Sequence, residues 1–99
     1  MCAVKDVGAL SRSGMSAFQA GQVGNAEFLL HQALMKAKQL KSPVLEAKIL
    51  NNIGLVASLT GKKEKASEAL SCALATLEQR VTSGSLHTII CKNLAESRG

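Results

Sequence analysis

Along most of the chain, small and apolar residues return every three or four positions, with polar residues between them. This spacing is that of one face of an α-helix. It predicts five helices, over residues 4–20, 24–40, 43–59, 63–81 and 86–97. The breaks between them carry helix-ending and helix-starting signals, namely Gly21, Gly61, the Ser42-Pro43 pair and the Thr-Ser-Gly-Ser stretch at 82–85.

The second predicted pair of helices repeats the first. When residues 8–40 are compared with residues 48–80, nine positions are identical, and eight of them are small or apolar. The residues that recur 40 positions later are Leu10, Gly14, Ala17, Gly21, Ala26, Leu30, Ala33, Leu34 and Gln39. Because these matches fall at helical spacing, the sequence predicts a tandem repeat of two helix pairs.

Two of the matched positions are glycines inside predicted helices. A glycine there costs roughly 1 kcal/mol relative to alanine, so Gly14 and Gly54 require a reason in packing. We expect them to let paired helices approach to the short end of the ~8–10 Å packing range. A Gly54→Leu substitution is then expected to overpack the contact and to cost ~1–3 kcal/mol.

These residues resemble the tetratricopeptide repeat, a helix–turn–helix unit with small and apolar residues at set intervals. The second unit supplies Leu50, Ile53, Gly54, Gly61, Ala66, Leu70 and Ala73, and the first supplies Leu10, Gly14, Gly21, Ala26, Leu30 and Ala33. The stretch from Leu50 to Gly54, followed by Gly61-Lys62, is similar to the longer repeats of the kinesin light chain class. A shift of 41 extends the similarity to residues 91–95, at the start of a third unit.

The resemblance implies one all-α domain over residues 1–99, built from tandem antiparallel helix pairs in a superhelix of about five helices. Its units span about 4–41 and 43–81, and a capping or half-repeat helix follows at 85–97. The resemblance also implies a scaffold or adaptor. Such a protein binds a peptide or helix of a partner protein in a concave groove, which the first helix of each pair lines. An enzyme that uses a pocket between helices is a further alternative, and the absence of a paired acid/base motif counts against it, so we expect a protein that is not an enzyme.

The resemblance also indicates which residues face that groove. Carried over by position, they are Ser11, Arg12, Met15, Phe18, Gln19, Lys48, Asn51, Asn52, Leu55, Ser58, Lys92 and Asn93. The adjacent amides Asn51 and Asn52 are the strongest candidates, because an amide offers both a donor and an acceptor to a peptide backbone. The alternative is a solvated polar face that binds no ligand.

The predicted fifth helix carries an apolar stripe of Leu86, Ile89, Ile90 and Leu94, and no sixth helix is predicted to cover it. Since each unit of a repeat array packs only on its neighbours, an uncovered stripe favours self-association into a two-fold homodimer. The alternative is a cap whose stripe packs wholly inward.

The chain has a net charge of +5 and only two aromatic residues, Phe18 and Phe28. The positive charge favours an acidic partner or a phosphate surface. The lysines are spread along the chain without aromatic residues between them, so a nucleic-acid-associated function is the weaker alternative.

The cysteines and histidines do not form a recognisable chemical site. Cys2, Cys72 and Cys91 show no CxxC spacing, and His31 and His87 have no metal-ligand partner at a suitable spacing. Neither a catalytic constellation nor a phosphate loop is recognisable. A signal peptide and an apolar run of the ~18 residues that suggest a membrane span are both missing, so we expect a cytoplasmic protein without a cofactor.

Overall fold

The computed structural model describes residues 3–78 and 85–98, and within these ranges the chain forms five helices and no strand. They are α1 (Ala3–Gln19), α2 (Val23–Gln39), α3 (Pro43–Leu59), α4 (Lys63–Glu78) and α5 (Ser85–Arg98). The predicted all-α class and the number of helices are therefore confirmed. The predicted end of the fourth helix at Val81 lies outside the described residues. None of the described helices is long and apolar enough to cross a membrane.

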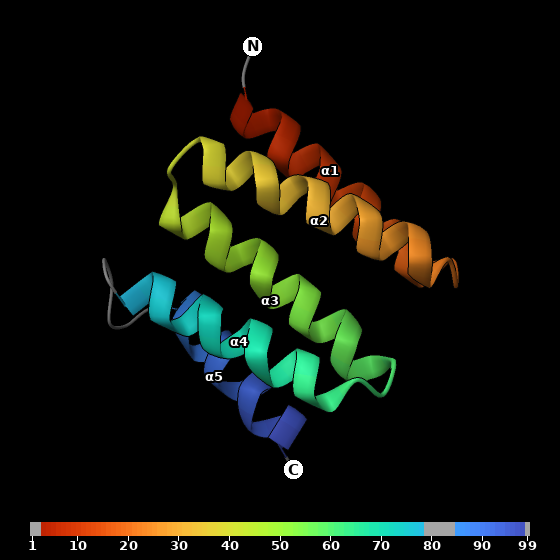
Figure 1. The fold of residues 1–99 in the computed structure, drawn as a ribbon, viewed down its shortest axis with the longest axis vertical. Helices are drawn as coiled ribbons and strands as arrows, with labels where there is room; N and C mark the ends of the chain where they lie inside the picture. Colours follow the sequence, from red (N-terminus) through yellow and green to blue (C-terminus); the bar gives the residue numbers. More distant parts are fainter. Residues whose placement is uncertain (1–2, 79–84, 99) are drawn as a thin grey trace.

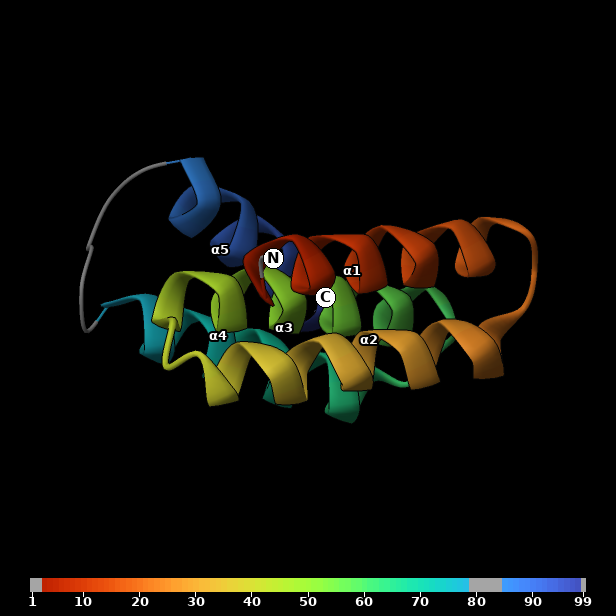
Figure 2. The ribbon, with the colours of Figure 1, turned by 90° about the horizontal axis from the view of Figure 1, so that it is seen from above.

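Two antiparallel helix pairs lie side by side, with α2 packed against α1 and α4 packed against α3 (Figure 1). The central helix is α3, since it also packs against α1, α2 and α5. Seen from above, α1 and α5 lie on one side of α3, whereas α2 and α4 lie toward the other side (Figure 2). The molecule is a flat array of 40 × 34 × 18 Å, with different helices on its two broad faces.

The two glycine turns have the same geometry. Gly21 and Gly61 have φ angles of +82° and +83°, in the left-handed region where a side chain is strained. The residue after each glycine donates its backbone N–H, at 2.8 Å, to a carbonyl oxygen of the preceding helix: Gln22 to Ala17, and Lys62 to Ala57. Both helices thus end in a Schellman motif at the same place in the repeat.

The connection between the two pairs uses the same motif without a glycine. Lys41 has a φ angle of +52°, and the backbone N–H of Ser42 donates to the carbonyl oxygen of Ala37 at 3.3 Å. α3 then begins as the sequence predicts: the Ser42 hydroxyl accepts from the backbone N–H of Leu45 at 3.3 Å, and Pro43 occupies the first turn.

Gly14 and Gly54 make equivalent contacts. A Cβ atom at Gly14 would lie 2.9 Å from Cγ of Leu30, and one at Gly54 would lie 2.6 Å from Cγ of Leu70. Leu30 and Leu70 are themselves 40 residues apart, and both are completely buried. The same helix crossing is built twice, which confirms the packing role predicted for the two glycines.

The apolar interior runs through α3. One cluster joins α1, α2 and α3 and contains Val7, Ala33, Leu34, Ala37 and Ile49. The other joins α3, α4 and α5 and contains Ala47, Leu70, Ala73, Leu77, Ile90 and Leu94. Leu50 of α3 packs against both clusters, so the two helix pairs share one core.

α5 buries part of the stripe that the sequence assigns to a dimer face. Ile90 has no exposed surface and Leu94 is 9% exposed, because both pack into the core cluster shared with α3 and α4. This corrects the prediction for Ile90 and Leu94, since a side chain buried within the chain cannot contact a second copy. Ile89 remains 48% exposed, so the stripe does not pack wholly inward either. The side chain of Leu86 lies outside the described residues.

Candidate binding groove

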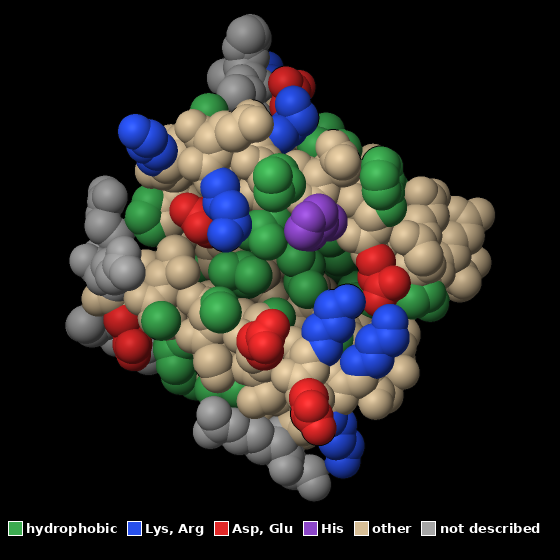
Figure 3. Space-filling view, viewed as in Figure 1, with side chains coloured by type: hydrophobic (Ala, Val, Ile, Leu, Met, Phe, Trp, Pro, Cys, Tyr) green, Lys and Arg blue, Asp and Glu red, His purple; other side chains and the backbone are tan. Residues whose placement is uncertain are grey.

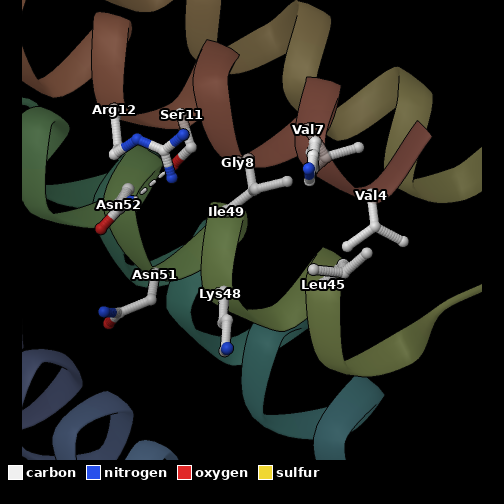
Figure 4. A pocket seen from close by; sticks show the side chains of 11 residues that line it. Val4, Val7, Gly8, Ser11, Arg12, Leu45, Lys48, Ile49, Asn51 and Asn52 are labelled. Carbon is white, nitrogen blue, oxygen red and sulfur yellow. Dashed lines mark hydrogen bonds between the residues drawn. The ribbon is translucent and has the colours of Figure 1, made fainter. Parts of the chain in front are cut away.

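A groove with a volume of about 520 Å³ runs between α1 and α3, on the face that also carries α5 (Figure 4). Its lining consists of Val4, Lys5, Val7, Gly8, Ser11 and Arg12 from α1 and of Leu45, Lys48, Ile49, Asn51 and Asn52 from α3. We call this site the α1–α3 groove. Its volume falls within the range of ~300–1,000 Å³ that is typical of ligand pockets.

The groove combines exposed apolar surface with positive charge. Val4 is 54% exposed and lines the groove together with the half-buried Leu45. Lys5, Arg12 and Lys48 are exposed around it, and no acidic side chain belongs to its lining. Because like charges around a concave site reinforce one another, we expect a positive potential in the groove.

Helical spacing explains how these side chains come together. Lys5 and Arg12 are seven residues apart, which is about two turns, so both lie on the same face of α1. Lys48 and Asn52 are one turn apart on α3. Gly8 lies between the two α1 cations, and the Arg12 guanidinium folds back over it: a Cβ atom at Gly8 would be 3.1 Å from Nη1 of Arg12.

Two similar side-chain hydrogen bonds join α1 to α3 and α3 to α5. The side-chain amide of Asn52 in α3 donates to the hydroxyl oxygen of Ser11 in α1 at 3.0 Å. The side-chain amide of Asn93 in α5 donates to the amide oxygen of Asn51 in α3 at 2.8 Å. Ser11 and Asn51 are 40 residues apart, the repeat period, and Asn52 and Asn93 are related by the shift of 41 that aligns the third unit. α5 therefore stacks on α3 as α3 stacks on α1.

This geometry changes the interpretation of Asn51. The sequence predicts a side chain that faces a bound peptide, whereas Asn51 is only 9% exposed and its oxygen accepts from Asn93. Asn52 is half-buried and donates to Ser11. Both side-chain amides therefore form hydrogen bonds to a neighbouring helix. Replacing them would perturb the packing of the helices as well as the groove.

Some of the predicted groove residues line the α1–α3 groove, and others lie outside its lining. Ser11, Arg12, Lys48, Asn51 and Asn52 line the groove. Met15, Phe18, Leu55, Ser58 and Asn93 are half-buried outside its lining, and Gln19 and Lys92 are exposed outside it. Sequence reasoning missed the other residues of the lining, which are Val4, Lys5, Val7, Gly8, Leu45 and Ile49. The seven-residue spacing from Lys5 to Arg12 was the available signal for the first of the two cations.

The face that carries α2 and α4 has a different character (Figure 3). Basic and acidic side chains are interspersed there around apolar ones. Lys62 and Glu27 form an ion pair at 2.8 Å, and the hydrogen bond from Lys62 holds the pKa of Glu27 below its ordinary value. The hollow beside His31 on α2 has a volume of only about 80 Å³. Among the described residues, no group of three His, Cys, Asp or Glu side chains is placed to hold a metal ion.

No family model, curated protein or solved structure matches this chain.

Proposed function

We propose that this chain is a scaffold or adaptor of tetratricopeptide type, which binds a peptide or helix of a partner protein in the α1–α3 groove. The observation that carries the proposal is the repeated hydrogen bond between first helices, from Asn52 to Ser11 and from Asn93 to Asn51. It holds α1, α3 and α5 next to one another on one face. A recessed face lined by successive first helices is the peptide-binding surface of the family that the sequence resembles.

The composition of the α1–α3 groove supports the same function. Sites that bind peptides combine apolar contact surface with a few placed polar groups. Val4 and Leu45 supply the first, and Lys5, Arg12 and Lys48 supply the second. In this proposal the helix pairs follow the superhelical arrangement of the family, and the protein acts in the cytoplasm without a cofactor and without catalysis.

A peptide selection on a sterically blocked groove tests the proposal. Random peptides displayed on phage are selected on the immobilised chain, and their affinities are measured for a Gly8→Phe variant. A Cβ atom at residue 8 meets only the end of the Arg12 side chain, so the ring enters the groove without entering the core. We expect the selected peptides to lose about tenfold or more in affinity, which corresponds to ~1.4 kcal/mol.

The matched control is Gly24→Phe. Gly24 lies on α2, and a Cβ atom there meets nothing within 4 Å, so this variant adds the same ring outside the groove. It is expected to bind the selected peptides as the unmodified chain does, and circular dichroism should show equal helicity for all three proteins. Peptides that bind Gly8→Phe with unchanged affinity, or a selection that returns no binder, would contradict the proposal.

A further inference from the structure

We propose that the segment bound in the α1–α3 groove is acidic and carries an aliphatic residue next to its carboxylates. This inference rests on the proposed function and specifies the chemistry of the partner. It is drawn from the charge, the exposed apolar surface and the placement of Arg12 in the groove.

None of the described residues neutralises the three cations of the groove. Lys5, Arg12 and Lys48 form no ion pair with another residue that the structure describes, whereas Lys62 pairs with Glu27. On the face of α2 and α4, by contrast, lysines and acidic residues are interspersed (Figure 3). The lining of the groove thus gathers three positive charges and no acidic side chain, and carboxylates of a partner complement it.

Arg12 is placed to take part in this recognition. Its guanidinium lies over Gly8, where the missing Cβ leaves room for it, so the charged group stays beside the groove. A guanidinium presents its N–H groups as a planar fork, which can donate two parallel hydrogen bonds to one carboxylate. Lys5 and Lys48, which are flexible point charges, add attraction for further acidic groups.

The apolar part of the groove specifies the second feature of the segment. Val4 is 54% exposed, and the half-buried Leu45 lines the groove beside it, whereas Ile49 at its floor is only 2% exposed. Covering this surface with an aliphatic side chain removes apolar area from water, which stabilises the complex. Lys5 is the chain neighbour of Val4, and Lys48 lies about one turn after Leu45, so the carboxylates and the aliphatic side chain must be close together in the partner.

These features favour a protein segment over a nucleic acid. Single-stranded nucleic acids bind to positively charged grooves that also carry aromatic side chains for base stacking. The lining of the α1–α3 groove contains no aromatic residue, and its exposed apolar side chains are aliphatic. The phosphates of a nucleic acid could pair with the three cations, but the groove offers no aromatic side chain on which the bases could stack.

Two charge variants test the inference on the whole chain. The first, Lys5→Gln/Arg12→Gln/Lys48→Gln, removes three positive charges from the groove. The second, Lys36→Gln/Lys38→Gln/Lys63→Gln, removes three from exposed positions of α2 and α4 that do not line it. Both variants have the same net charge, so a difference between them reports the location of the charges.

We expect peptides selected from the random library to be enriched in aspartate and glutamate next to leucine, isoleucine or valine. Their affinity should fall about tenfold or more in the first variant and less than about twofold in the second, since each exposed ion pair contributes modestly. The loss should also shrink as the salt concentration rises.

Three results would overturn the inference. The selected peptides could be neutral or basic, or both variants could weaken binding equally. A random-sequence DNA or RNA strand of about 20 nucleotides could bind in the groove more tightly than the selected peptides. In the first two cases the proposed function still stands if binding is lost in Gly8→Phe, whereas a library that yields no binder contradicts both proposals.

Discussion

At the scale of single residues, glycines that look alike in the sequence have different roles in the structure. Gly14 and Gly54 lie against the buried side chains of Leu30 and Leu70, which cannot move away freely. Gly8, on the same helix as Gly14, faces only the end of the flexible Arg12 side chain. The repeat identified the first two as packing positions. It did not reveal Gly8, because residue 48 in the second unit is a lysine.

Alanine substitutions should separate these roles. Gly8→Ala is expected to stabilise the protein by about 0.5–1 kcal/mol, because alanine is the better helix former and the Arg12 guanidinium can shift. Gly54→Ala is expected to destabilise it by about 1 kcal/mol or more, since its Cβ would lie 2.6 Å from Cγ and 2.7 Å from Cδ2 of Leu70. Gly14→Ala should fall between the two, because its closest approach is 2.9 Å. Urea denaturation measures all three free energies of unfolding, and a gain in stability for Gly54→Ala would contradict the packing described.

At the scale of helices and turns, the sequence predicted the ends of α1, α2 and α3 to within a residue. Gly21 and the Ser42-Pro43 pair are local signals for the end and the start of a helix, and the helices end and begin at these residues. The positive φ angle of Lys41 could not be predicted, because the residue there is neither glycine nor asparagine. It arises from the way the second helix of one pair must turn to begin the next pair.

Glycine substitutions usually destabilise a protein, but at the strained turn of Lys41 we expect glycine to raise the free energy of unfolding. Lys41→Gly is expected to stabilise the protein by about 1 kcal/mol, because glycine adopts a left-handed conformation without steric cost. Lys38→Gly, at an exposed position in the last turn of α2, should instead destabilise it by up to about 1 kcal/mol. Thermal unfolding of the two variants checks both signs. A lower melting temperature for Lys41→Gly would contradict the strain at this turn.

The inward direction of Asn51 could not be predicted from the sequence either. Helical spacing places Asn51 on the groove face of α3, but only the position of α5 decides that Asn93 meets it there. Similarly, the sequence shows the apolar stripe on α5. Only the packing of α5 on the core determines that Ile90 and Leu94 point inward and that Ile89 does not. In each case the local pattern fixes the face of a helix, and the tertiary packing decides what covers it.

The hydrogen bond between Asn93 and Asn51 should hold α5 in place. Asn93→Ala leaves the buried oxygen of Asn51 without its donor, which typically costs about 1–3 kcal/mol. The loss should appear as faster amide hydrogen exchange in α5, with smaller changes in α1 and α2. Asn52→Ala is the matched control, because Ser11 and Asn52 are only half-buried and water can replace the lost bond. Equal exchange in α5 for both variants would contradict this role.

At the scale of the whole molecule, the flat array has two faces with different chemistry. One carries α2 and α4 with interspersed charges, and the other carries the α1–α3 groove with three cations and exposed aliphatic surface. Five of the residues that line the groove, namely Ser11, Arg12, Lys48, Asn51 and Asn52, were predicted through the resemblance. The gathering of Lys5, Arg12 and Lys48 around Val4 required the packing of α1 beside α3.

The most direct test of the account is an NMR titration of the isotope-labelled chain with a peptide selected from the random library. We expect the amide signals that shift to be those of residues 4–12 and 45–52, which include the lining of the α1–α3 groove. Signals of α2 and α4 should stay in place. Shifts concentrated on α2 and α4, with the groove residues unchanged, would contradict the central claim that the first helices of this array form its binding surface.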